Sequence, residues 1–94
     1  MITHVVTFKF ADPTNRDEAK KRLEELPAQI PQIRSLTVGL DSLGTQVSHD
    51  AVLITTHADV DELKAYKAHP AHEEFGAWVR PLLTSRVVVD YEDQ

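Results

Sequence analysis

Residues 66–78 read YKAHPAHEEFGAW, and the predicted fold is organised around this stretch. It holds two of the five histidines, one of the two tyrosines and the only tryptophan. Pro70 interrupts the helix before it, because the residue preceding a proline avoids the helical region, and proline is favoured at the first position of a new helix. We therefore predict two helices that meet at Pro70, and we expect any chemistry to lie beside this junction.

The residues on either side extend both helices. Upstream, Asp59 is placed to cap the first helix, and Glu62 three residues later completes a capping box. Val60 and Leu63 are expected on its inner side. After the proline, apolar residues recur at helical spacing as far as the break at Pro81, and they mark the buried side of the second helix: Phe75, Trp78, Val79, Leu82 and Leu83.

Four segments have the pattern of β-strands. Residues 2–10 alternate, and one face of the predicted strand carries Ile2, His4, Val6, Phe8 and Phe10. Residues 33–40 alternate as well. Residues 51–56 are almost wholly apolar or β-branched, which favours a central strand buried on both faces. Three consecutive valines followed by Tyr91 predict the last strand near residues 87–91.

A further helix is predicted over residues 15–26, with Asn15 and Glu18 in capping positions. The elements then follow the order β-α-β-β-α-β, which is typical of an α+β, ferredoxin-like fold with one four-stranded antiparallel sheet. Helices cover only one face of such a sheet, so apolar side chains remain on the other. We therefore expect a homodimer in which two sheets pack face to face.

Composition narrows the classes of function. The chain has 94 residues, is 41% hydrophobic and 27% charged, and carries a net charge of −5, so we expect one globular domain over residues 1–94 and no nucleic-acid partner. It has no cysteine, which excludes disulfides and thiolate sites. Its apolar runs are short, so we expect no membrane association, no signal peptide and a cytoplasmic location.

Four stretches, in order along the chain, resemble the stress-responsive A/B barrel (Dabb) domain: HVVTFKF (4–10), IPQIRSLTVG (30–39), YKAHPAH (66–72) followed by Phe75, and VVDY (88–91). The third is the most specific. This resemblance covers essentially the whole chain and implies a homodimer of ferredoxin-like subunits, whose two sheets form a dimeric α+β barrel.

The resemblance also implies candidate catalytic residues. The best-understood members are plant polyketide cyclases similar to olivetolic acid cyclase, which close a linear polyketide by aldol condensation. Their catalytic tyrosine and histidine fall on Tyr66 and His72, and a histidine of their first strand falls on His4. Another pocket histidine of these enzymes falls near Ala51, so the same substrate is not implied.

The residues themselves allow two interpretations of this region. At the first turn of a helix, His72 is disfavoured as an imidazolium, and a neutral imidazole can act as a general base, while the Tyr66 hydroxyl could donate to a developing enolate oxygen. Alternatively, His72 hydrogen-bonds the turn and Tyr66 only packs its ring. His69 is expected to hold the helix junction beside the pocket. His4 is expected either in a hydrogen-bonded core or lining the pocket.

We therefore predict a pocket between sheet and helices that contains Tyr66, His72 and His4, with Phe8 and Trp78 as its apolar wall and His69 beside it. It would bind a hydrophobic small molecule without a metal or another cofactor. Whether the chain is an enzyme stays open; if it is, we expect a cyclase-like acid–base reaction. One alternative is a stress-associated structural protein with a closed core. Another is a relative of haem-degrading or quinol monooxygenases, whose haem branch would reveal itself by haem uptake.

Overall fold

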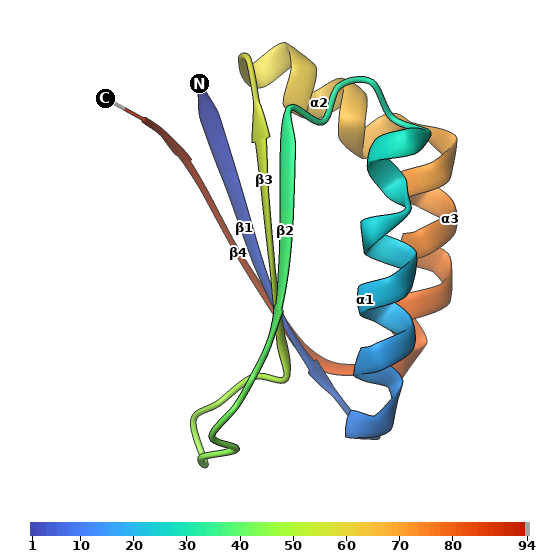
Figure 1. The fold of residues 1–94 in the computed structure, drawn as a ribbon, viewed down its shortest axis with the longest axis vertical. Helices are drawn as coiled ribbons and strands as arrows, with labels where there is room; N and C mark the ends of the chain where they lie inside the picture. Colours follow the sequence, from blue (N-terminus) through green and yellow to red (C-terminus); the bar gives the residue numbers. More distant parts are fainter. Residues whose placement is uncertain (94) are drawn as a thin grey trace.

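A computed structural model describes residues 1–93 as one layer of strands with a layer of helices on one side (Figure 1). Short 3₁₀ turns lie at Pro13–Asn15, Leu26–Ala28 and Arg80–Leu82. The helices and strands follow in this order: β1 (Ile2–Phe10), α1 (Arg16–Glu24), β2 (Ser35–Leu40), β3 (Ala51–His57), α2 (Val60–Ala68), α3 (Pro70–Val79) and β4 (Leu83–Glu92).

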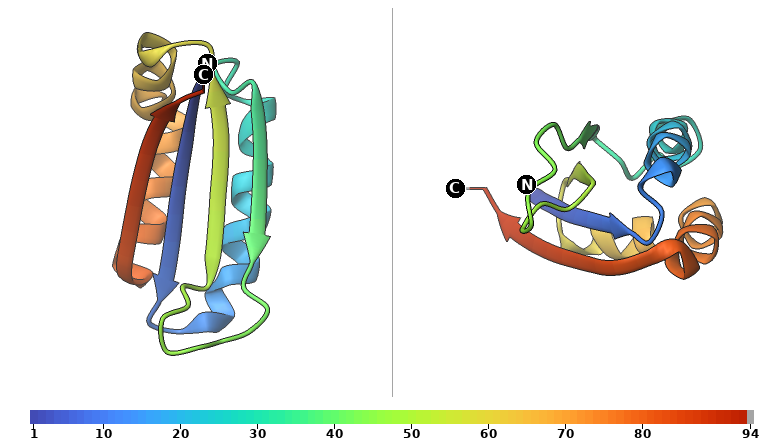
Figure 2. Two further views of the ribbon diagram at one scale, coloured as in Figure 1. Left: turned by 90° about the vertical axis from the view of Figure 1, so that its left-hand side faces the viewer. Right: turned by 90° about the horizontal axis from the view of Figure 1, so that it is seen from below.

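The four strands form one antiparallel sheet in the order β2-β3-β1-β4, with the helices behind it in the left view of Figure 2. This arrangement confirms the predicted ferredoxin-like fold. The register places His4 of β1 between Thr55 of β3 and Asp90 of β4. Because paired residues point to the same face, all three side chains leave the sheet on the helix side.

The core lies between this face and the helices. Val6, Phe8 and Phe10 of β1 are buried there in one cluster with Leu23 of α1. Ile30, which follows a short turn after α1, has no exposed surface. Alternation in β1 thus predicted correctly which side chains enter the core.

The described helices leave the other face of the sheet uncovered, so β3 is not buried on both faces as we expected. Ala51 and Leu53 are buried, whereas Val52 and Ile54, which point the other way, are only half-buried. On the same open face, Val87, Val89 and Tyr91 of β4 are 51%, 56% and 48% exposed. We call this apolar surface, formed by Val5, Val52, Ile54, Val87, Val89 and Tyr91, the open face.

Two predicted helix details need correction. Asn15 is the N-cap residue of α1, as expected, but makes no side-chain cap bond; Asp12 caps the preceding 3₁₀ turn, accepting from the Thr14 amide at 3.0 Å. Val60 of α2 is 49% exposed rather than turned inward. Only Leu63 of the predicted pair enters the core, because the first turn of α2 projects beyond the end of the sheet.

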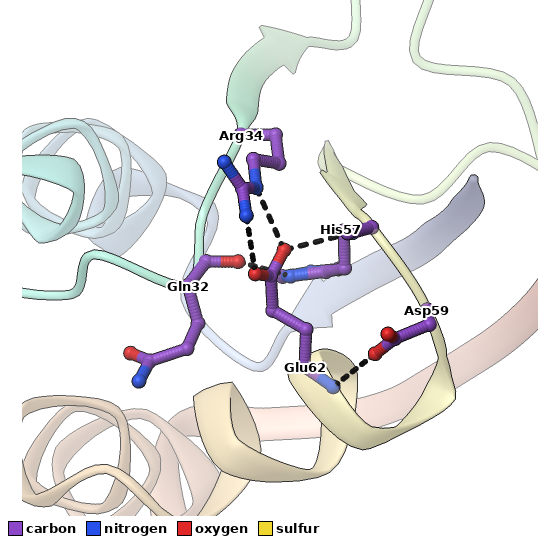
Figure 3. Close-up of polar contacts among 6 residues, drawn as sticks. Gln32, Arg34, His57, Asp59 and Glu62 are labelled. Atoms are coloured by element: carbon purple, nitrogen blue, oxygen red, sulfur yellow. Dashed lines mark hydrogen bonds and ion pairs between the residues drawn. The ribbon is translucent and has the colours of Figure 1, made fainter.

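The start of α2 is tied to the start of β2 (Figure 3). Asp59 accepts from the Glu62 amide at 2.8 Å, as expected for the N-cap. The Glu62 carboxylate accepts from the Ala58 amide at 2.7 Å and, through both oxygens, from Arg34 at 2.9 and 2.8 Å. The capping box of α2 is thus extended by the bidentate ion pair between Arg34 and Glu62, which connects α2 to the start of β2.

Glu62→Gln is expected to destabilise the protein at neutral pH but not in strong acid. Hydrogen bonds from Arg34 and then the Ala58 amide lower the pKa of Glu62 to about 2. A depressed pKa contributes stability that is full above the unfolded value of about 4.5 and is lost as pH falls toward 2. Thermal unfolding should therefore show a lower midpoint temperature for the variant than for wild type at pH 7, and the two midpoints should coincide near pH 2. Glu18→Gln, which removes a carboxylate from an exposed ion pair on α1, serves as control. An equal difference in midpoint at both pH values would show that the effect does not come from the Glu62 charge.

Candidate functional site

A cavity of about 110 Å³ lies between the sheet and the helices. Its wall is mostly apolar: Val6, Phe8, Leu23, Leu53, Phe75 and Val79. Five polar side chains complete the lining: His4, Tyr66, His72, Arg80 and Arg86. An apolar wall with a few converging polar groups is the usual composition of a small-molecule site, although this volume suits a small ring or one end of a longer molecule.

Tyr66, on the last turn of α2, is the central residue of the site. Its side chain is completely buried, and three imidazole rings surround it, with ring centroids at 4.6 Å for His72, 4.9 Å for His57 and 5.9 Å for His4. The Tyr66 hydroxyl has no hydrogen-bond partner within residues 1–93. An unsatisfied buried hydroxyl costs about 1–3 kcal/mol, so this group is a donor that a ligand could use.

Both members of the predicted pair are neutral at physiological pH. Burial raises the pKa of Tyr66 to about 12, so its hydroxyl stays protonated. Burial lowers the pKa of His72 to about 4, against the opposing effect of a hydrogen bond with the Lys67 backbone. We expected a neutral His72 from its place at the first turn of α3; the main cause of its lowered pKa is burial.

His4 is buried and paired with a carboxylate. Its Nδ1 contacts Asp90 Oδ1, and the Lys67 ammonium lies 3.6 Å from the other Asp90 oxygen. Burial lowers the pKa of His4 despite the opposing effect of Asp90. In a neutral ring, Nδ1 carries the hydrogen that is donated to Asp90, which leaves Nε2 as an acceptor. His4 thus combines both expected roles, since it is hydrogen-bonded core and also lines the cavity.

His57 was missed by the sequence analysis. It is fully buried and donates from Nδ1 to the Gln32 carbonyl at 2.7 Å (Figure 3). Its Nε2 lies 2.9 Å from the Thr55 hydroxyl. With both nitrogens engaged, it supports the Tyr66 ring and has no nitrogen left for a ligand. Continuing the alternation of β3 one residue beyond Thr56 would have placed His57 on the core face.

The remaining predicted site residues divide into two groups. Phe8 lines the cavity, edge-on to Phe75 at 6.4 Å between ring centroids. His69 lies outside the lining and caps α3, accepting from the Ala71 amide at 3.1 Å, which is the structural role expected for it. Trp78 also lies outside, half-buried, with the Arg22 guanidinium 4.1 Å from its ring centroid. The structure therefore brings together Tyr66, His72, His4 and Phe8, but neither His69 nor Trp78.

Two further searches concern residues 1–93 alone. No three histidine, aspartate or glutamate side chains in this range are grouped so that they could hold a metal ion. Among the helices described, none is long and apolar enough to cross a membrane.

Comparisons with known proteins agree with this architecture. A model of the stress responsive A/B barrel domain (Dabb) family matches residues 2–93. The stress-response A/B barrel domain-containing protein At5g22580 of Arabidopsis thaliana is 32% identical over 94% of this chain and 82% of its own. Two crystal structures are described as dimeric, ferredoxin-like proteins of unknown function.

The first, from Bacteroides fragilis, is 30% identical with a TM-score of 0.87, and the alignment covers 98% of this chain and 95% of the other. The second, from Thermobifida fusca, is 27% identical with a TM-score of 0.86, covering 98% and 90%. The motifs, the strand order and these matches lead to one conclusion: the chain belongs to the stress-responsive A/B barrel (Dabb) domain family.

Proposed function

We propose that this chain forms a homodimer in which each subunit binds a small, largely apolar molecule bearing a carbonyl or phenol group. The polar group of the ligand would meet Tyr66 and His72 at the cavity. The observation that carries this proposal is the buried Tyr66 hydroxyl without a partner in the described chain. A ligand oxygen that accepts from it would remove the cost of the unsatisfied donor.

The closed-core alternative is less well supported. A purely structural role requires Tyr66 and His72 to be fully hydrogen-bonded in a core without a cavity. The unpartnered hydroxyl and the adjoining cavity of about 110 Å³ favour binding instead. Retaining an unsatisfied buried donor is costly, and such groups in folded proteins call for a functional explanation.

Two observations support the proposed dimer: the apolar open face, and similar solved structures that are described as dimeric. Six apolar side chains share a sheet face that none of the described helices covers. Contiguous apolar surface of this kind marks an interaction site. The similar structures from Bacteroides fragilis and Thermobifida fusca are described as dimeric, and a second copy is the occupant that we propose. The cavity lies on the helix side, so each subunit would keep its own. The cytoplasm stays the predicted location.

Enolate chemistry is the second candidate, and the neutral state of both rings favours it. His72 would take a proton from the carbon next to a carbonyl, and the electrons of that C–H bond would form an enolate whose oxygen accepts from Tyr66. The enolate carbon could then attack a second carbonyl of the same molecule. A pKa of about 4 makes His72 a weak base in the empty site; the nearby enolate would raise it as the proton moves.

Binding of phenol and toluene tests the proposed function. The two molecules have nearly the same shape, but only phenol can exchange a hydrogen bond with Tyr66 and His72. Titrations followed by NMR of the histidine rings should show saturable phenol binding that shifts His72 and His4, with toluene about five- to tenfold weaker, the value of one hydrogen bond. Equal affinities, or shifts confined to the open face, would overturn the proposal.

A further inference from the structure

The cavity has a charge opposite to that of the chain. Two arginines are among its lining residues, Arg80 at the end of α3 and Arg86 on β4, and no carboxylate of residues 1–93 is among them. The whole chain carries a net charge of −5. We call Arg80 and Arg86 together the cationic rim.

Gly76 leaves the space that the Arg80 guanidinium occupies beside the cavity. Gly76 lies one helical turn earlier and lines the cavity itself. A Cβ atom at this position would lie only 2.8 Å from Arg80 Nη1 and 3.4 Å from Cζ. The absence of a side chain at Gly76 therefore lets the guanidinium lie directly on α3, beside the cavity.

Arg86 reaches the same cavity from the sheet. The register pairs Arg86 with Phe8, so its side chain leaves the sheet on the helix side, next to an apolar wall residue. The positive charge of Arg86 also lowers the pKa of both Tyr66 and His72, in opposition to burial at Tyr66 and together with it at His72. This influence means that the Arg86 charge acts on the same two polar groups that we assign to the ligand.

Neither guanidinium of the cationic rim has an ion-pair partner within residues 1–93. Several other cations of the chain do: Lys20, Arg22, Arg34 and Lys67. An arginine without a partner keeps all five donors available, in a planar arrangement that matches a carboxylate.

We propose that the natural ligand is a small organic acid, whose carboxylate pairs with Arg80 and Arg86 while its carbonyl or phenol group meets Tyr66 and His72. The inference rests on the proposed function and names its substrate class: a keto acid or a phenolic acid rather than a neutral ketone. The apolar wall holds the carbon frame between the two polar ends. A carboxylate at the rim stays partly solvated, so it need not be buried as a charge.

Benzoate and benzamide distinguish charge from shape, because the two molecules are nearly isosteric and only benzoate is an anion. At low ionic strength, wild-type protein should bind benzoate about fivefold more tightly than benzamide, as expected for solvent-exposed ion pairs. Arg86→Gln and Arg80→Gln should each lower this ratio, and the double variant should bring it to about one. Arg86→Lys should keep part of the preference. Lys21→Gln removes the same charge from an exposed site on α1 and should keep all of it.

The outcomes separate this inference from the proposed function. If wild-type protein binds benzoate and benzamide equally, or if the double variant keeps the wild-type preference for benzoate, the proposed role of the cationic rim is wrong. If wild-type protein binds phenol but does not prefer benzoate, the proposed function stands and only the assignment of an acidic ligand is wrong. If wild-type protein binds neither phenol nor benzoate, both fall. Circular dichroism of each variant checks folding, and the single variants decide if the double variant does not fold.

Discussion

Tyr66→Phe is expected to keep the fold and to lose most of the selectivity of the cavity for phenol over toluene. The substitution removes only a hydroxyl that has no partner in the described chain. Deleting an unsatisfied group costs little, so the free energy of unfolding should change by less than about 1 kcal/mol and can increase. Phenol affinity should fall about five- to tenfold, and any enolate turnover by about a hundredfold or more in kcat/KM.

Tyr66→Ala, in contrast, should strongly destabilise the protein. It removes the whole ring from between the imidazoles of His57 and His72, where the side chain is completely buried. Truncating a buried aromatic residue costs about 3–5 kcal/mol, a large part of the total stability of a small domain. Urea unfolding of both variants measures the contrast.

Tyr91→Phe is the matched control, because Tyr91 is 48% exposed and lies on the open face, away from the cavity. It should leave phenol binding unchanged. A Tyr66→Phe protein that is destabilised as strongly as Tyr66→Ala would show that the hydroxyl has a structural partner. Unchanged selectivity for phenol would show that the hydroxyl does not meet the ligand.

Val89→Glu is expected to convert the proposed dimer to monomers. Val89 is 56% exposed in the single chain and pairs with Val5 across two strands of the open face. In a symmetric dimer each substitution occurs twice, so two carboxylates would be buried without partners. Even about 2 kcal/mol for each would raise the dissociation constant about a thousandfold. Sedimentation equilibrium over a range of concentrations measures this change.

Val60→Glu provides the control for this experiment. Val60 has nearly the same exposure, 49%, but belongs to α2 in the helix layer. The variant should stay dimeric, which would separate the effect of position from that of added charge. A Val89→Glu protein that remains dimeric, or a wild-type protein that is monomeric at high concentration, would exclude the open face as the interface.

Local patterns predicted much of the architecture because their physical causes are local. Alternation over residues 2–10 identified the buried face of β1, and Pro70 separated α2 from α3 as expected. His69 was assigned to the helix junction from its place before a proline, and its ring caps α3. The helix break at Pro70 and the His69 cap depend on contacts within a few residues, whereas the buried face of β1 was read from a period of two that any half-buried strand has.

The resemblance to the Dabb family supplied what local patterns could not. It pointed to Tyr66, His72 and His4, and these three residues do line one cavity. It did not point to Trp78, which was chosen from helical spacing and packs with Arg22 outside the cavity. Helical spacing identifies a helix face but not which part of that face meets a cavity.

The sequence by itself thus determined the elements, their order and the core-facing side chains of β1, since these follow from hydrophobic periodicity and from proline. Only the tertiary structure decided that Asp90 would bind His4, that His57 would support Tyr66, and that Arg80 and Arg86 would line the same cavity. His4 and Asp90 are 86 residues apart. Strand register sets such pairings, and a shift of one residue would send each side chain to the opposite face.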